Sequence, residues 1–399
     1  MLSLLSVAAC AAHLPPCPRA GGAAWRELAN SHLRLRTDLE EEPARTLLSS
    51  LAQLRAALLV VFHASPDLAT GALPVIVVDR GWSDVADASL SGFFTRELFQ
   101  PLLVMRNEAN VAQEEDIKHE LVHYFSSLIM PEQPRWLAEG LATYFQTLDY
   151  DAEKQQVTVG RPPADRLATV QQLGLLTLDE MAAMKTLDSD TGRFYASAWL
   201  TVHYLMNHQT QALARYEAAL NRQEPFPDAW REAFGGLTGA ELSEQVRRYM
   251  DGGQYALLTF RMPPVASDAV QARVLSDAEA HATRAELLVQ GSRGMQREER
   301  VDRRPREEFR ARARAELAEA LRQDPAEVLG RAIAAFDLGE TLDVAAARAA
   351  TERQPSDWMA WLLLAKALEQ HGVADGRAEA TAKAAELAAL DPSVTLAWK

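Results

Sequence analysis

Three residues in one short stretch have the types and the spacing that metal chemistry needs. Residues 118–125 read KHELVHYF, so His119 and His123 lie four positions apart and Glu120 follows the first histidine. Each residue of an α-helix turns by about 100°, which places positions i and i+4 roughly 40° apart on one face. Both imidazoles can therefore reach one metal ion, and Glu120 can take a proton from a metal-bound water without being a ligand.

A second motif follows at residues 134–145, which read PRWLAEGLATYF. The pattern predicts a second helix whose one carboxylate, Glu139, can return to the metal as a third ligand. Two histidines and one glutamate leave a fourth coordination position open for water, which is typical of a catalytic zinc rather than a structural one. The alternative is a buried polar cluster that holds no metal.

The first motif is expected on a helix with one apolar side. Its start is expected near Asn110 or Ala112. Its end is expected near Met130, because Pro131 and Pro134 cannot continue a helix. The apolar residues on the side opposite the two histidines, at about 100° per residue, are Ile117, Leu121, Tyr124 and Leu128. One side of this helix can therefore pack into a core while the other side faces a cleft.

The two motifs together resemble those of the gluzincin zinc peptidases. HELVH at 119–123 followed by WLAEGLA at 136–142 is most similar to the bacterial peptidase MA-like group, which has a thermolysin-like catalytic domain. The resemblance covers about residues 25–260. It implies one zinc ion per chain, held by the two histidines and Glu139, with Glu120 as the general base. The motifs are specific for the clan but not for the substrate.

Tyr195 is the candidate for a second catalytic role. Related peptidases use a tyrosine or histidine from the lobe after the zinc helix to hydrogen-bond the tetrahedral oxyanion, which stabilises the transition state. Tyr195 stands at the start of a helix expected over 195–206, and its hydroxyl is a good donor. The alternative is a core tyrosine. His203, on the same apolar helix, is expected to be a hydrogen-bonded core histidine and not a ligand.

Two features of related enzymes are missing from this chain. Aminopeptidases of the clan carry a G-x-M-x-N stretch that grips the free amino terminus, whereas residues 105–108 read MRNE and lie too close to the first motif. An endopeptidase is therefore expected. Thermolysin-like enzymes also place an acidic residue four positions after the glutamate ligand, where this chain has Thr143. Asp149, Asp151 or a backbone carbonyl are the alternative partners for the histidines.

Hydrophobic patterning predicts the elements that must position these residues. Alternation at 32–38 and a β-branched run at 73–79 predict strands, and leucines at helical spacing predict a long helix over 41–62. We therefore expect an α+β catalytic domain, which the resemblance makes zincin-like. It would consist of a small mixed β-sheet lobe at 24–110 and a mostly helical lobe with the zinc site at 111–262.

The chain changes character after a predicted linker at 263–275. Residues 276–399 are rich in alanine, leucine, glutamate and arginine in a helical pattern, with a charged, glycine-containing connection at 291–305. Asp-Pro or Gln-Pro pairs recur at 324, 354 and 391, close to the tetratricopeptide period of roughly 34 residues. This part resembles an all-α, tetratricopeptide-like array, which implies a surface for a peptide or protein partner. A structural buttress is the alternative.

Composition limits the other partners. The chain has 399 residues, of which 48% are hydrophobic, and a net charge of −14. These values indicate a globular protein and argue against nucleic acid, which needs concentrated Lys and Arg.

The first twenty residues resemble an export signal. VAAC at 7–10 resembles a bacterial lipobox in which Cys10 is lipidated, although no Lys or Arg precedes it. No other stretch has the roughly 18 apolar residues that span a bilayer. We expect an export segment and tail at 1–20 and a periplasmic or envelope-associated lipoprotein whose membrane contact is the lipid on Cys10. The alternative is a cytoplasmic protein with a disordered tail.

These observations predict a zinc-dependent metallopeptidase, an endopeptidase that acts on peptide or protein substrates. Glu120 would activate a zinc-bound water, while zinc and Tyr195 would hold the oxyanion. The alternative is an envelope-associated, protein-binding scaffold with a latent or inactive metallopeptidase-like domain. The presence of Glu120 favours the enzyme, because a scaffold has no chemical need for a base there.

Overall fold

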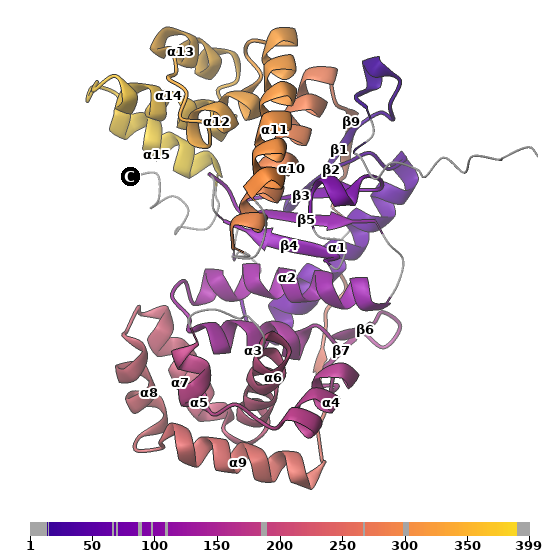
Figure 1. Cartoon of the computed structure of the whole chain (residues 1–399), viewed down its shortest axis with the longest axis vertical. Helices are drawn as coiled ribbons and strands as arrows, with labels where there is room; N and C mark the ends of the chain where they lie inside the picture. Colours follow the sequence, from indigo (N-terminus) through magenta and orange to yellow (C-terminus); the bar gives the residue numbers. More distant parts are fainter. Residues whose placement is uncertain are drawn as a thin grey trace, which may run out of the picture. The chain divides into compact units, whose positions relative to one another are not determined.

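The computed structural model is a mixed α/β protein with fifteen α-helices and nine strands among the described residues. The chain divides into two compact units, whose elements are labelled in Figure 1. Unit 1 comprises residues 1–49, 69–108 and 268–399, and unit 2 comprises residues 50–68 and 109–267. The described residues are 14, 16–65, 68, 71–86, 90–96, 99–107, 111–184, 190–265, 268–297 and 303–388. The lipobox-like stretch with Cys10 lies outside them.

Unit 1 contains a six-stranded mixed sheet. Its strands are β1 (Arg26–Ala29), β2 (Leu33–Thr37), β3 (Leu73–Val78), β4 (Gly92–Thr95), β5 (Leu102–Arg106) and β9 (Gln271–Val274). They lie in the order β4-β5-β3-β2-β1-β9. β3 pairs in parallel with β2 and with β5, whereas the other neighbouring strands are antiparallel. The central β3 is an almost continuous apolar run, LPVIVV, as expected of a strand covered on both faces.

The carboxy-terminal part of unit 1 is a run of six helices. They are α10 (Asp277–Arg297), α11 (Arg303–Gln323), α12 (Val328–Phe336), α13 (Val344–Arg353), α14 (Trp358–Gln370) and α15 (Arg377–Ala388). α10 packs along α11 and α14 packs along α15, as Figure 1 shows. α12 contacts α10, α11 and α14, whereas α13 packs against α14.

The sheet and these helices share one hydrophobic core. Ile76 of β3, Leu288 of α10 and Leu363 of α14 belong to a single buried cluster. The sequence predicts separate domains for the sheet lobe and the helical array, joined by a linker at 263–275. In the structure they form one unit, and β9, which pairs with β1, lies within that segment. Periodicity shows that a segment has a buried face, but it does not show which distant segment covers that face.

α10 continues through much of the segment that was predicted as a connection. It extends to Arg297, and α11 begins at Arg303. Gly291, the first residue of the predicted connection, lies inside α10, where an added Cβ would clash with the carbonyl oxygen of Val85. The glycine is therefore explained by close packing against another segment of unit 1 and does not mark the end of a helix.

Two turns of the helical region repeat the same arrangement. In the first turn Arg331 Nε donates to the carbonyl oxygen of Pro325, and in the second Trp361 Nε1 donates to the carbonyl oxygen of Pro355. Each proline follows a helix, α11 or α13, as the sequence pattern predicted. The arrangement fits a tetratricopeptide-like array. The third of the pairs that end in proline, Asp391-Pro392, lies outside the described residues.

Unit 2 is mostly helical and has a small antiparallel sheet. The strands β6 (Asp149–Asp151), β7 (Gln156–Val159) and β8 (Leu258–Arg261) are hydrogen-bonded in that order. The helices are α2 (Val111–Ile129), α3 (Arg135–Phe145), α4 (Ala164–Leu173), α5 (Leu178–Ala183), α6 (Thr191–His208), α7 (Thr210–Asn221), α8 (Phe226–Phe234) and α9 (Gly239–Gly252). α3 packs against both α2 and α6, so three helices carry the residues of interest.

One further helix, α1 (Glu41–Val61), begins in unit 1 and ends in unit 2. Among the described helices it alone is long and apolar enough to cross a membrane by length and composition, whereas no such stretch was expected beyond the amino terminus. Core helices of other proteins pass the same test, and 44% of its most apolar window is buried.

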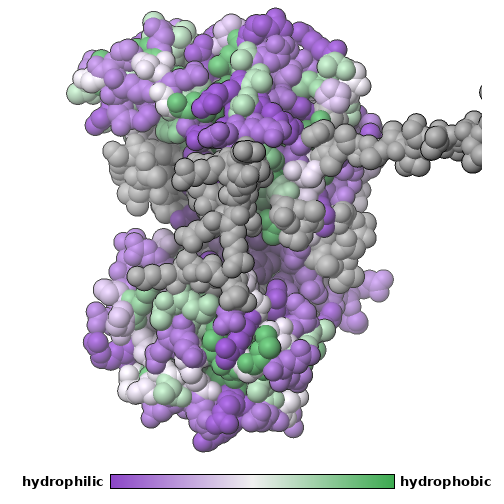
Figure 2. Space-filling model, viewed as in Figure 1, coloured by the Kyte–Doolittle hydropathy of each residue, from purple (hydrophilic) through white to green (hydrophobic). Residues whose placement is uncertain are grey.

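Figure 2 shows a mainly hydrophilic surface with small, scattered hydrophobic areas.

Candidate metal centre

The two sequence motifs lie on neighbouring helices of unit 2. α2 begins at Val111, between the two expected starts, and ends at Ile129, one residue before the expected end. α3 begins at Arg135, directly after Pro134. α2 and α3 run side by side in Figure 1. This packing brings the second motif against the first.

The side chains of His119, His123 and Glu139 converge. The Nε2 atoms of the two histidines are 3.1 Å apart, and each lies 3.3 Å from Oε2 of Glu139. The three side chains are only 13–20% exposed. The ligand set that the sequence predicts is therefore brought together as a triangle of donor atoms with limited access to solvent.

The dimensions of this triangle fit a tetrahedral metal ion. Zinc bonds of about 2.0–2.1 Å to nitrogen and oxygen give distances of about 3.3 Å between ligand atoms in a tetrahedron. In addition, Oε2 of Glu139 is buried and no donor in the described part of the chain is aligned to hydrogen-bond it. A buried carboxylate oxygen without an aligned hydrogen-bond donor raises the free energy of the folded state, and a bound cation would compensate for the missing donor.

Glu139 and His123 have shifted pKa values. Burial disfavours the charge on Glu139, but the two neighbouring imidazoles outweigh this effect and hold the pKa of the carboxyl well below its usual range. Burial also opposes a charged His123, yet the Glu139 carboxylate raises the pKa of His123 above its ordinary value. Glu139 is therefore anionic at neutral pH, which is the form that binds a metal.

Gln146, which the two motifs did not indicate, contacts the ring nitrogen of His119 that lies outside the triangle. Its Oε1 lies 3.2 Å from Nδ1 of His119. If Nδ1–H donates to this oxygen, Nε2 keeps its lone pair for a metal, as is usual for metal-binding histidines. Gln146 lies seven positions after Glu139, so two turns along one face of α3 would have pointed to it.

The carboxylates considered as partners for the histidines lie elsewhere. Asp151 pairs with Lys154 at 2.6 Å, and Asp149 lies 3.6 Å from Arg161. Thr143 is buried, and its hydroxyl has no hydrogen bond within the described residues. The amide of Gln146 therefore takes the place of the expected carboxylate.

Tyr195 lies beside the donor triangle. Its ring centroid is 6.0 Å from that of His119. α6 begins at Thr191, so Tyr195 is in the second turn and not at the helix start that the sequence suggested. Burial and the negative charges of Glu139 and Glu120 raise the pKa of Tyr195, and its hydroxyl keeps its proton at neutral pH. A phenol in this state can donate a hydrogen bond into the site.

Glu120 lies next to His119 on α2 and is half-buried. Its negative charge contributes to the raised pKa values of both His123 and Tyr195. The carboxylate is therefore within electrostatic reach of a ligand and of the candidate proton donor. This placement agrees with the role of a base that acts beside a metal without binding it.

Two contacts hold α6 and Tyr195 in position. The guanidinium of Arg166 covers the ring of Tyr195, with Cζ 5.4 Å from the ring centroid. Gly140, the residue after Glu139, faces α6. A Cβ at this glycine would lie 2.5 Å from Cγ2 of Val202, so only glycine allows α3 and α6 to approach this closely.

His203 is the core histidine that the sequence predicted. Its Nε2 lies 2.9 Å from the carbonyl oxygen of Gly160, to which it donates. Its Nδ1 accepts from the hydroxyl of Tyr249 at 2.8 Å. Burial lowers the pKa of His203, which keeps it neutral. Both ring nitrogens are satisfied by protein groups, so His203 is not available as a ligand.

A second group of ligand types lies in unit 1. One ligand atom each from Cys17, His281 and Glu316 lie within 4.8 Å of one another. Nδ1 of His281 is 2.6 Å from Glu316, and Arg284 is also 2.6 Å from that carboxylate. Burial raises the pKa of the Cys17 thiol to about 12, which disfavours the thiolate that binds metals. Protein partners already satisfy His281 and Glu316.

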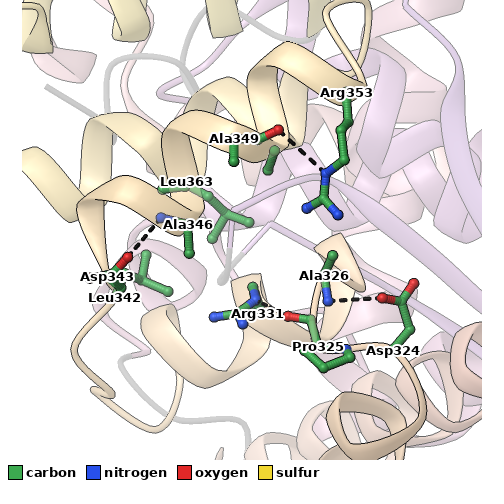
Figure 3. A pocket seen from close by; sticks show the side chains of 12 residues that line it. Asp324, Pro325, Ala326, Arg331, Leu342, Asp343, Ala346, Ala349, Arg353 and Leu363 are labelled. Atoms are coloured by element: carbon green, nitrogen blue, oxygen red, sulfur yellow. Dashed lines mark hydrogen bonds between the residues drawn. The ribbon is translucent and has the colours of Figure 1, made fainter.

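The carboxy-terminal helices enclose a hollow of about 500 Å³. Figure 3 shows the turn at 324–326 on one side of it and α13 with its alanines on the other. Arg331 and Arg353 each bond a backbone carbonyl through Nε. The carboxylates of Asp324 and Asp343 accept backbone N–H groups of the chain next to them.

Part of unit 2 matches a known family model. Residues 116–227 match the family model DUF1570, which is described as a protein of unknown function. This segment contains the three donor residues, Glu120 and Tyr195. A search of curated proteins finds no significant match. The similarity therefore centres on the part of unit 2 that forms the candidate metal centre.

Proposed function

We propose that this chain is a zinc-dependent metallopeptidase that cuts internal bonds of peptide or protein substrates. One observation carries the proposal: two imidazole nitrogens and one carboxylate oxygen form a triangle with edges of 3.1, 3.3 and 3.3 Å. Three protein ligands leave a coordination position open, as catalytic zinc requires. The resemblance of the two motifs to gluzincin peptidases supplies the reaction class.

The residues divide the work as follows. The two histidines and Glu139 would hold the ion, which when bound supplies Lewis acidity toward a substrate carbonyl and a water molecule. The carboxylate of Glu120 would accept a proton from the attacking water and deliver it to the leaving amine nitrogen. The hydroxyl of Tyr195 would donate to the carbonyl oxygen as negative charge develops there. Gln146 would hold the proton of His119 on Nδ1.

Peptide cleavage read by mass spectrometry tests the proposal. Zinc-loaded wild type is expected to make internal cuts in a mixed pool of unfolded peptides. Glu120→Gln should keep its zinc and cut about 10²–10⁴-fold more slowly, because it lacks the base. Glu132→Gln, an exposed glutamate in the turn after α2, is the matched control and should behave as wild type. Trimming from one end alone would indicate an exopeptidase, and no cleavage by wild type would contradict an enzyme.

The second candidate is an envelope-associated scaffold with a latent or inactive metallopeptidase-like domain. The hollow in Figure 3 favours it, because the guanidinium groups of Arg331 and Arg353 lie beside an alanine surface and suit an acidic peptide. Fluorescence anisotropy with acidic and basic peptides tests this function. Binding of acidic peptides that Arg353→Gln weakens, together with no cleavage, would support the scaffold. Cleavage without such binding would exclude it.

We also propose that the protein is exported and anchored through a lipid on Cys10. The support is the lipobox-like stretch at 7–10. Fractionation of cells that express wild type and Cys10→Ser is the test. Wild type should be found with membranes and Cys10→Ser should not; equal distribution of the two proteins would contradict the anchor.

A further inference from the structure

Unit 2 has a cavity that the candidate metal centre does not use. It has a volume of about 390 Å³ and lies where the ends of α1, α3 and α6 meet α7 and β8. Its walls include three phenylalanines, Phe62, Phe145 and Phe260, together with Leu213 and Leu258. None of the donor triangle, Glu120 or Tyr195 lines it. The volume is typical of small-molecule sites, which occupy about 300–1,000 Å³.

One carboxylate lies on the wall of this apolar cavity. It belongs to Glu217 of α7, and within the described residues no hydrogen bond or ion pair reaches it. Burial raises the pKa of Glu217 to about 7. The other titratable side chains on the wall are His63, whose ring packs on Phe260 at 5.8 Å, and Tyr144, whose buried hydroxyl lacks a hydrogen bond within the described part.

We propose that this cavity binds a small organic cation, an amine on an apolar chain or ring, whose ammonium group pairs with Glu217. The apolar part would bury its surface against the phenylalanines and leucines. The ammonium would give Glu217 the partner that the described residues do not provide, and the aromatic faces add cation–π attraction. A neutral ligand would leave the carboxylate unpaired, and an anionic ligand would be repelled by it.

Isothermal titration calorimetry on the full chain tests the proposal. The probes are 2-phenylethylamine and hexylamine, with 2-phenylethanol and phenylacetate as neutral and anionic analogues. Wild type should bind at least one amine at a single site, more tightly than the alcohol, and should not bind phenylacetate. Glu217→Gln should weaken amine binding at least tenfold, because it keeps the shape and removes the charge. Ala214→Trp should abolish binding by filling the cavity, which Ala214 lines.

Two controls separate this site from other acidic groups. Glu153→Gln makes the same charge change on the exposed turn between β6 and β7 and should bind the amine as wild type does. Glu120→Gln should also bind normally, so that failure of the peptidase proposal leaves this result unaffected. Equal amine affinity in wild type and Glu217→Gln, or no binding of either amine to wild type, would overturn the proposal.

Discussion

The side chains of the candidate centre have roles that can be separated by substitution. Glu139 brings a negative charge, and each histidine brings a ring nitrogen 3.3 Å from the Oε2 atom of Glu139. Tyr195 brings a proton donor but no ligand atom. Loss of a ligand should therefore remove the metal, whereas loss of the donor should leave the metal in place.

Tyr195→Phe tests this separation. We expect the variant to keep one zinc per chain and to lose about 10²–10³ in kcat, because the hydroxyl acts only as charge develops on the carbonyl oxygen. KM should change little. Steady-state kinetics and metal analysis measure both effects, and Tyr150→Phe, on strand β6, is the matched control. Unchanged turnover in Tyr195→Phe would remove this residue from the mechanism.

The sequence predicts the roles of individual residues where those roles follow from spacing along a helix. The four-residue spacing of His119 and His123 predicts their common face, and the apolar helix around His203 indicated its core role. Gln146 was missed, because its contact with His119 depends on how α3 lies against α2. The position of Tyr195 within α6 was misjudged by one turn, because polar residues and a glycine precede it.

Among the elements, the contact between α3 and α6 is the one that positions both halves of the site. α3 carries Glu139, and α6 carries Tyr195. Gly140 is the point of closest approach, since a Cβ there would also lie 2.6 Å from the backbone oxygen of Ala198. The separation of the two helices therefore depends on the lack of one methyl group.

Gly140→Ala should destabilise the protein even though alanine is the better helix former. The added methyl overpacks the contact, and we expect the free energy of unfolding to fall by about 1–3 kcal/mol. Gly192→Ala is the matched control, because nothing lies within 4 Å of a Cβ at that position on α6. Urea unfolding followed by circular dichroism measures both variants. Equal stability of Gly140→Ala and wild type would show that α6 can move away without cost.

Elements with strong periodicity were predicted and are confirmed, including β2, β3 and α1. β9 was not predicted, because its four residues, QARV, are all exposed and show no alternation. Its strand conformation comes from pairing with β1, a segment more than two hundred residues earlier. Pairing of this kind depends on the fold and cannot be read from local patterns.

For the molecule as a whole, the core of unit 1 joins the sheet to the carboxy-terminal helices. Unit 2 holds the candidate metal centre and the cavity lined by Glu217. The change in composition near residue 263 predicts a domain boundary. The sequence does not show that the sheet lobe and the carboxy-terminal helices share one core, because their contacts join segments far apart in the chain.

The partly buried carboxylate of Glu217 in unit 2 makes the stability of the chain depend on pH. The pKa of Glu217 rises from 4.5 to about 7 in the folded protein. The native state therefore holds this proton more tightly than the unfolded chain, and the contribution of Glu217 becomes less favourable as pH rises from 4.5 to 7. Glu217→Gln should increase the free energy of unfolding by about 1–3 kcal/mol at pH 8 and change it little at pH 4. Urea unfolding of both proteins at the two pH values tests this; the same difference at both would contradict it.

Zinc analysis and X-ray absorption spectroscopy at the zinc edge test whether the donor triangle holds zinc. We expect one zinc per full chain, with nitrogen and oxygen neighbours at about 2.0–2.1 Å. The metal should be lost in His123→Ala and in Glu139→Ala. A chain that binds no zinc would contradict the account, and so would a sulfur neighbour at about 2.3 Å, which would place the ion at Cys17 instead.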